Sequence, residues 1–250
     1  MTPNVFDNLP DVFEELVDWP KRLANEAPFY RGLFERVRAK SVVDVACGTG
    51  RHAAMFHSWG LQVEGSDVSP RMIDCARRHF GEPSGPRWVV RSFDEPIEAA
   101  VPFDAALCVG NSLALAADIA AVQRAVQQML SAVRSGGVVV VHVLNLWHLP
   151  DGPCVWHKCK RLKLPQGEVF LARGVHRCGD QGYVELIVAD LSGGGPMRGE
   201  SARLSGIEAD ELRRMALQAG AAEVQLFGGY QEQPYDRQQS VDLLMVARKA

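Results

Sequence analysis

Residues 41–53, SVVDVACGTGRHA, decide the fold. The stretch opens with apolar, β-branched residues that are typical of a buried strand, and it continues into a loop with glycines at 48 and 50. Because glycine has no Cβ, such a loop can turn sharply and bring its backbone close to a ligand. The stretch therefore predicts a strand that leads into a ligand-binding turn, and the ligand is a dinucleotide or another small molecule.

Strand and helix patterns alternate on both sides of this turn, which favours a doubly wound, parallel α/β sheet. The residues between the expected strands show the helical spacing of apolar positions, and the last strand, VVVVHVL, is apolar enough to be buried on both faces. The expected strands are 41–46, 61–67, 86–92, 103–110 and 138–144, and the expected helices are 51–60, 69–80 and 118–133, with SGG at 135–137 as the stop of the last helix.

The remaining segments predict a lid and a cap on this core, within a single domain of 250 residues. Residues 1–40 show helical spacing with breaks at Pro20 and Pro28, and we expect a helical lid there. Within 151–205, turn signals separate VFLARGVHR and YVELIVADL, which indicates an inserted antiparallel β cap. A helix and two strands over 206–250 then complete a seven-stranded, Rossmann-like sheet around the cofactor-binding core at 41–150.

Composition favours a small-molecule partner in the cytoplasm. The formal charge of −3 provides no dense basic surface for nucleic acid or an acidic membrane. The acidic N-terminus lacks the features of a secretory signal, and GGVVVVHVLNLW is too short to span a bilayer. The six cysteines are irregularly spaced in a long chain, so we expect reduced core residues in a reducing compartment.

The glycine loop fits two cofactor classes. GTGRHA matches the dinucleotide pattern G-x-G-x-x-A, and Asp67 follows Gly50 by 17 residues, near the position of a ribose-binding acid. However, Asp44 precedes Gly48 by four residues, and a carboxylate there would repel a pyrophosphate but suit an ammonium or sulfonium group. No Lys-Ser or Lys-Thr pair follows the glycines, which excludes a P-loop. A cationic ligand is preferred, and an NAD(P)-dependent oxidoreductase remains the alternative.

Four motifs in order, VVDVACGTG, VEGSDVSPRMI, FDAALCVGNSLAL and SGGVVVVHVLN, resemble those of class I S-adenosylmethionine-dependent methyltransferases. DWPKRLANEAPF at 18–29, GNSLAL at 110–115, LFGGYQEQPYD and SVDLLMVARK are similar to the glycine/sarcosine N-methyltransferase branch. The resemblance covers nearly the whole chain. It implies S-adenosyl-L-methionine as cofactor and direct methyl transfer to a small molecule, with an amine as the leading acceptor.

The resemblance also implies a set of site residues. Those expected at the methionine portion of the cofactor are Ala46, Gly48, Gly50, Asn111 and Ser112. Trp19 and Arg22 are expected to fold over the cofactor, and the Arg22 guanidinium to bind the cofactor's carboxylate. Asp67 holds the ribose, Met72 packs on the adenine, and Ser92 with Phe93 lies near the adenine amine, where Asp94 is the other candidate. The expected substrate-binding residues are Asn145, Tyr230 and Tyr235.

Departures from the family leave a third possibility, an idle cofactor-binding protein. Phe6 and Phe13 stand where the family usually has tyrosines, so any hydroxyl contact to ligand is missing. Transfer from a sulfonium needs positioning more than acid–base groups, and we assign no catalytic residue. His142 is interpreted as a core histidine.

Two further patterns bear on partners. Cys154, His157 and Cys159 lack a paired CxxC arrangement, so no metal is expected. VGNS stands where nucleic-acid methyltransferases carry an Asn/Asp-Pro-Pro-aromatic motif, which again favours a small acceptor. We expect the cap to select that acceptor, and its turns DQG and SGGGP to let it close.

Overall fold

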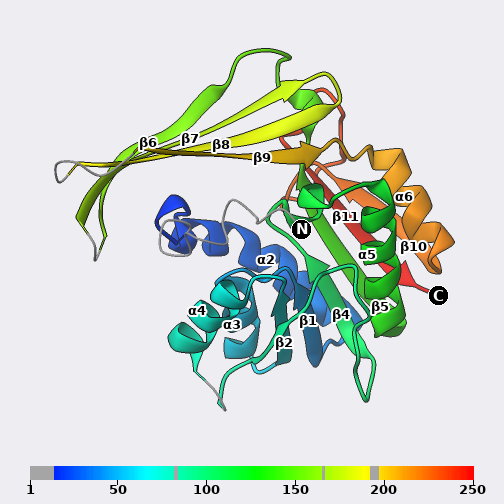
Figure 1. The fold of residues 1–250 in the computed structure, drawn as a ribbon. Helices are drawn as coiled ribbons and strands as arrows, with labels where there is room; N and C mark the ends of the chain where they lie inside the picture. Colours follow the sequence, from blue (N-terminus) through cyan, green and yellow to red (C-terminus); the bar gives the residue numbers. More distant parts are fainter. Residues whose placement is uncertain (1–13, 82–83, 165–166, 192–196) are drawn as a thin grey trace.

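The computed structural model describes residues 14–81, 84–164, 167–191 and 197–250. A seven-stranded sheet has the order β10-β11-β5-β4-β1-β2-β3, and a separate four-stranded sheet has the order β6-β7-β8-β9. β1 to β5 pair in parallel, whereas β11 is antiparallel to both of its neighbours. Figure 1 shows the smaller sheet as a separate layer above the larger one. The predicted doubly wound sheet with an antiparallel β cap is confirmed.

The strands of the large sheet are β1 (Ser41–Val45), β2 (Gln62–Asp67), β3 (Arg87–Val90), β4 (Phe103–Cys108), β5 (Val133–Leu144), β10 (Ala221–Phe227) and β11 (Asp242–Lys249). The helices are α2 (Trp19–Val37), α3 (Arg51–Ser58), α4 (Pro70–Phe80), α5 (Ile119–Ala132) and α6 (Ala209–Gln218), with short 3₁₀ turns η1 (Ser112–Leu115) and η2 (Leu146–His148). The small sheet contains β6 (Val155–Leu164), β7 (Gly167–Cys178), β8 (Gln181–Asp190) and β9 (Arg198–Ser205).

Local sequence signals explain where several helices begin. Asp18, Ser69 and Asp118 each accept a hydrogen bond from a backbone N–H in the first turn of the helix that follows, which satisfies a donor that has no partner inside the helix. Pro70 occupies the first position of α4, where its missing N–H costs nothing. The predicted break at Pro28 is wrong, because α2 continues through it.

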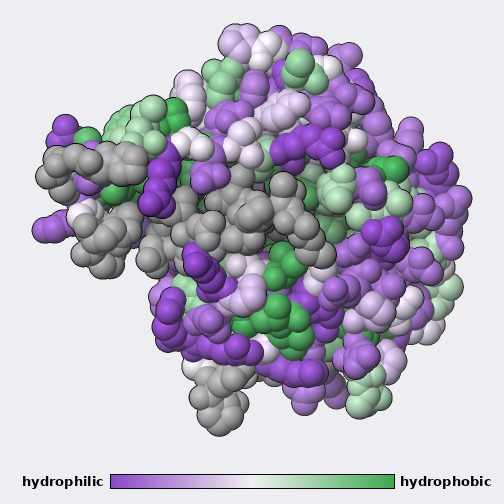
Figure 2. Space-filling view, viewed as in Figure 1, coloured by the Kyte–Doolittle hydropathy of each residue, from purple (hydrophilic) through white to green (hydrophobic). Residues whose placement is uncertain are grey.

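Two apolar clusters lie on the opposite faces of the large sheet. α5 and α6 pack on one face with Val43, Val139 and Met245, and α2, α3 and α4 pack on the other with Val42 and Val140. Side chains alternate between the two faces of a strand, and both faces of β5 are buried. This is why the sequence of β5 contains a continuous run of valines. Hydrophilic side chains occupy much of the outer surface seen in Figure 2.

The cap contains two more strands than the sequence patterns predicted. β7 and β8 include the predicted VFLARGVHR and YVELIVADL, whereas β6 and β9 lack clear alternation of polar and apolar residues and were not predicted. Val175, Val184 and Leu204 of the cap belong to the main core cluster. The cap is therefore packed continuously with the core.

Two other expectations need correction. β5 begins at Val133 and includes the SGG that was predicted to stop the helix, with a shift of register at that point. The six cysteines are free, but only Cys47, Cys75 and Cys108 are buried, since Cys159 and Cys178 are exposed on the cap. In the described ranges, no helix has the length and apolar character required to cross a membrane.

Candidate functional site

A cavity of about 650 Å³ lies between the carboxyl ends of the central strands and the underside of the cap. This is the edge of an open α/β sheet at which ligands bind. We call Asp44, Ala46, Gly48, Asp67 and Met72 the floor of the cavity, and Lys158, Arg173, Val184 and Leu204 its roof. Its walls are Leu16, Val17, Asp18, Trp19, Lys21, Arg22, Asn25, Cys47, His52, Val109, Gly110, Asn111, Ser112 and Leu115.

Two carboxylates on the floor differ in how they are held. Asp67 accepts hydrogen bonds from the backbone N–H of Gly48 at 2.9 Å and of Ser69 at 2.9 Å, so it organises the glycine loop. Asp44 is 1% exposed, and neither of its carboxylate oxygens has a hydrogen-bond partner among the described residues. Burial, together with the nearby charge of Asp67, raises the pKa of Asp44 to about 8. A buried acid without a partner, facing a cavity, favours a cationic ligand group.

Glycines in the loop and on the neighbouring strand β2 are required for two separate reasons. Gly50 has φ +84°, a left-handed conformation, and a Cβ there would lie 2.5 Å from the Trp88 ring. Gly65 on β2 has no such φ, yet a Cβ there would lie 2.6 Å from the same ring. Trp88 is buried behind the loop and fills the space that both glycines leave. Gly48 and Ala46 also have positive φ, and both line the cavity.

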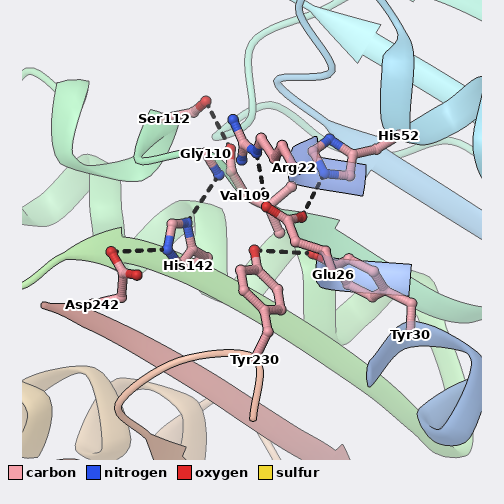
Figure 3. Close-up of polar contacts among 10 residues, drawn as sticks. All are labelled: Arg22, Glu26, Tyr30, His52, Val109, Gly110, Ser112, His142, Tyr230 and Asp242. Carbon is pink, nitrogen blue, oxygen red and sulfur yellow. Dashed lines mark hydrogen bonds and ion pairs between the residues drawn. The ribbon is translucent and has the colours of Figure 1, made fainter. Parts of the chain in front are cut away.

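A buried ion pair holds Arg22 at the wall (Figure 3). Glu26, one helical turn further along α2, accepts from Arg22 Nε at 2.7 Å and from His52 Nε2 at 2.7 Å. Burial alone would raise the pKa of Glu26, but the hydrogen bonds and charges of His52 and Arg22 outweigh it and lower the pKa to about 2. Burial lowers the pKa of His52, so the neutral imidazole donates to an ionised Glu26. Arg22 also lies over the Trp19 ring, 5.3 Å from its centroid.

The loop after β4 forms the wall beside the glycine loop. Asn111 has φ +73°, and its side-chain oxygen accepts from Leu144 N–H, which joins β4 to the end of β5. His142 lies behind this wall: its Nδ1 accepts from Gly110 N–H at 3.3 Å, and its Nε2 lies 3.3 Å from Asp242 (Figure 3). His142 does not line the cavity, which agrees with its interpretation as a core histidine.

The roof brings two cations together. Lys158 on β6 and Arg173 on β7 are directly opposite each other in the antiparallel register, and both line the cavity. Lys158 Nζ donates to the backbone carbonyl of Leu16, whose side chain packs into the apolar cluster of the cap. In the parts of the chain that the structure describes, Arg173 makes no hydrogen bond or ion pair. Burial and the charge of Arg22 lower the pKa of Arg173.

The structure brings most of the predicted cofactor residues to the cavity: Trp19, Arg22, Asp44, Ala46, Gly48, Asp67, Met72, Asn111 and Ser112. Gly50 lies directly behind it as the N-cap of α3. Ser92 and Phe93 do not line the cavity. The Ser92 hydroxyl instead donates to Asp94, which also pairs with Arg124, and Phe93 packs against the main core.

None of the three predicted substrate-binding residues lines the cavity. Asn145 is buried, and its amide nitrogen donates to the carbonyls of Arg237 and Ser240 while its oxygen accepts from the Tyr235 hydroxyl at 3.0 Å. The Tyr230 hydroxyl accepts a hydrogen bond from the Tyr30 hydroxyl at 3.2 Å (Figure 3). These residues are engaged in holding the C-terminal loop on the core.

Four further points concern predictions from the sequence. Phe6 and Phe13, and the SGGGP turn, lie outside the described residues. The DQG turn packs against the core, since a Cβ at Gly182 would meet the Leu146 side chain at 2.7 Å. No group of three or more His, Cys, Asp or Glu side chains suited to a metal occurs in the described segments. Four residues belong to the site that no sequence motif predicted: Glu26, His52, Lys158 and Arg173.

The chain is similar in sequence to known methyltransferases. Residues 42–137 match the family model of a methyltransferase domain. The chain is 32% identical to human glycine N-methyltransferase over 164 residues, which is 56% of this chain and 55% of that protein. It is 31% identical over 113 residues to the dTDP-4-amino-2,3,4,6-tetradeoxy-D-glucose N,N-dimethyltransferase of Saccharopolyspora spinosa, which is 45% of this chain and 43% of that protein. The chain thus spans about half the length of the curated relatives it matches.

A solved structure shows the same fold over almost the full length. The sugar N-methyltransferase KedS8 of a Streptoalloteichus species aligns with a TM-score of 0.75 and 24% identity, covering 96% of this chain and 92% of that one. The alignment includes the cap as well as the sheet, since it leaves out only a small part of either chain.

Proposed function

We propose that this chain, which belongs to the class I S-adenosylmethionine-dependent methyltransferases in the glycine/sarcosine N-methyltransferase branch, methylates an amine nitrogen of a small molecule. The domain match and the relatives confirm the predicted family and its cofactor, S-adenosyl-L-methionine. The observation that carries the proposal is the cavity itself, which joins the floor at the glycine loop to the roof under the cap in one space. A cofactor and an acceptor can therefore meet inside it.

The residues of the floor suit this cofactor. The unpartnered carboxyl group of Asp44 would ionise when it pairs with the ammonium group of the cofactor's methionine portion. Asp67, fixed by two backbone N–H groups at the end of β2, would accept hydrogen bonds from the ribose hydroxyls. The guanidinium of Arg22, held by Glu26, would bind the carboxylate of the cofactor's methionine portion. Met72 is 4% exposed and offers an apolar surface to the adenine.

Positioning and water exclusion are the main demands of the reaction. When bound, S-adenosylmethionine supplies a methyl group already activated by its positive sulfur, so transfer needs an aligned nitrogen lone pair in a dry space. Leu115, Val184 and Leu204 give the upper part of the cavity apolar surface. His52 lines the wall, but its Nε2–H is engaged with Glu26. The chain therefore acts by holding and orienting both molecules.

The relatives support an amine acceptor. The names of the human protein and of the Saccharopolyspora protein share transfer to nitrogen, although one acts on glycine and the other on a nucleotide-linked amino sugar. An amine is the chemistry common to both. Within the proposal we place the protein in the cytoplasm, in keeping with six free cysteines and a net charge of −3. No nucleic-acid partner is proposed, and no oligomeric state is assigned.

Methyl transfer to a panel of small amines, with methyl-labelled S-adenosylmethionine, tests the proposal. We expect labelled product from at least one amine, and none from Gly48→Asp, which places a carboxylate in the cavity floor. Gly81→Asp is the matched control, because Gly81 has a similar φ of +65° but open surroundings. Product from Gly48→Asp at the wild-type rate would contradict the assignment of the site.

Calorimetric titration separates the remaining alternatives. S-adenosylhomocysteine should bind to wild type and NADH should not, because the two acids of the floor, Asp44 and Asp67, disfavour a pyrophosphate. Binding of NADH alone would favour an oxidoreductase. Binding of S-adenosylhomocysteine without product from any amine would favour an idle cofactor-binding protein.

A further inference from the structure

We infer that the acceptor carries an anionic oxygen group, a carboxylate or a phosphate, and that Arg173 binds this group with the help of Lys158. The inference rests on the proposed function and deepens it by naming the acceptor's chemical class. It starts from the roof of the cavity, where neither cation has a side-chain counter-charge at hydrogen-bond distance in the described part of the chain.

The position of Arg173 in its strand is the first observation. Val169, Leu171 and Val175 point to the same face of β7 as Arg173, since side chains alternate along a strand, and all three are buried. A guanidinium in this apolar row gives up hydration, yet Arg173 has no hydrogen bond or ion pair among the described residues. Buried charges in folded proteins are normally paired. Arg173 faces the cavity instead, so its partner is expected inside it.

The pairing of β6 with β7 is the second, independent observation. The register places Lys158 directly opposite Arg173, and like charges in that relation destabilise a sheet. Arg22 adds a third positive charge, which contributes to the lowered pKa of both Arg173 and Lys158. Asp18 also lines the cavity and offsets part of the charge on Lys158, but its carboxylate accepts from Lys21 N–H as the cap of α2. An anion between the two roof cations would relieve this repulsion.

The arrangement also fits the proposed chemistry. Asp44 and Asp67 on the floor suit the cationic groups of the cofactor, while the roof suits a negative group of the acceptor. The two molecules would therefore be sorted by charge to opposite ends of one cavity. The roof cations would also disfavour the ammonium form of a bound amine, which leaves its nitrogen lone pair free to accept a methyl group.

Anion binding to protein saturated with S-adenosylhomocysteine tests the inference directly. Inorganic phosphate and sodium acetate are titrated separately by calorimetry into wild type, Arg173→Gln and Arg161→Gln. Arg161 lies on the same cap but is exposed, so its variant matches the change in net charge. We expect wild type and Arg161→Gln to bind phosphate or acetate at least tenfold more tightly than Arg173→Gln. The stronger of the two anions identifies the group as phosphate or carboxylate.

Matched acceptors give a second readout. An α-amino acid is compared with its amide, and an amino-sugar phosphate with the unphosphorylated amino sugar, in the labelled-methyl assay. We expect the anionic member of one pair to be methylated at least tenfold faster, and Arg173→Gln to remove this preference. The affinity for S-adenosylhomocysteine should stay within twofold of wild type, because Arg173 belongs to the roof.

The outcomes separate the inference from the proposed function. Equal anion binding by wild type and Arg173→Gln, or no binding by either, overturns the inference even when amines are methylated. Conversely, a lack of S-adenosylhomocysteine binding defeats the proposed function, and the same titrations on ligand-free protein then still decide whether Arg173 binds an anion.

Discussion

On the floor of the cavity, Asp44 and Asp67 stand at the carboxyl ends of two adjacent parallel strands, whereas on the roof Lys158 and Arg173 face each other across an antiparallel pair. The floor carries two acids and the roof carries two cations. The floor is also embedded in the main sheet, with Asp44 1% exposed, while the roof belongs to a layer that stands above that sheet (Figure 1).

This difference teaches how one fold can separate two tasks. The parallel strands fix the floor through backbone pairing on both sides, so the floor has little freedom to vary. The cap strands can change side chains without altering that pairing, and the roof can therefore be adapted by substitution. The four predictions below test whether floor and roof are independent in this sense.

The largest expected effect comes from Asp44, the unpartnered acid on the floor. Because the pKa of Asp44 is raised from 3.8 to about 8, the native state holds a proton that the unfolded state has lost, and stability falls as the pH rises from about 4 to 8. Compared with Asp44→Asn, wild type should lose on the order of 5 kcal/mol of unfolding free energy over this range. Denaturant unfolding at several pH values measures the difference. Parallel pH profiles for the two proteins would mean that Asp44 is paired or hydrated.

Glu26 should show a pH dependence of the opposite sign. Its pKa is lowered to about 2, so its contribution to stability is complete above about pH 4.5 and is lost as the pH falls through 2. Glu26→Gln should reduce the unfolding free energy at pH 7 by about 3 kcal/mol, because it removes the charge that Arg22 and His52 share. It should also weaken binding of S-adenosylhomocysteine, since Arg22 loses its support. A variant as stable as wild type at pH 7 would refute the ion pair.

Asp67→Ala should act on the floor alone. Loss of a carboxylate that orders Gly48 and accepts ribose hydroxyls should weaken S-adenosylhomocysteine binding by about 1.5–3 kcal/mol, the range for hydrogen bonds to a charged group. Asp74→Ala on the exposed side of α4 is the matched control. Calorimetry measures both affinities. Anion binding at the roof should remain within twofold of wild type, and a parallel loss there would show that floor and roof are coupled.

The smallest expected effect lies outside both regions. Tyr235→Phe removes one hydroxyl that donates to Asn145, and it should lower the unfolding free energy by about 0.5–1.5 kcal/mol. Affinity for the cofactor product and transfer to the acceptor should be unchanged, because neither Tyr235 nor Asn145 lines the cavity. A large loss of methyl transfer with normal stability would indicate that Tyr235 contacts the acceptor.

The floor could be predicted from sequence because its residues lie in short, continuous motifs. Gly48 comes after β1 and Asp67 ends β2, and the alternation of strands and helices implies that these strands pair in parallel. Both residues are therefore expected at the same edge of the sheet, whatever the register. Arg22 and Met72 were placed through resemblance alone. The structure then supplies what no motif states, namely that Glu26 and His52 hold Arg22 from behind.

The roof could not be predicted in the same way, because it depends on the register between β6 and β7. The register shifts at Trp156 and Lys158, and a displacement by one residue would turn a side chain to the opposite face. One signal was available: Arg173 interrupts the apolar row of Val169, Leu171 and Val175. Asn145 and Tyr235, predicted from resemblance as substrate-binding residues, lie outside the cavity lining and are hydrogen-bonded within the fold, an engagement that depends on tertiary contacts.

The indole of Trp88 packs against Gly50 and Gly65, so this ring limits which side chains homologues can carry at those two positions. Among homologues in which residue 88 is small, position 65 should accept alanine, because the ring is the only neighbour closer than 3.0 Å to a Cβ there. Position 50 should favour glycine even then, since its φ of +84° strains any other residue whatever the space. Substitutions should therefore be correlated between 65 and 88, and rare at 50.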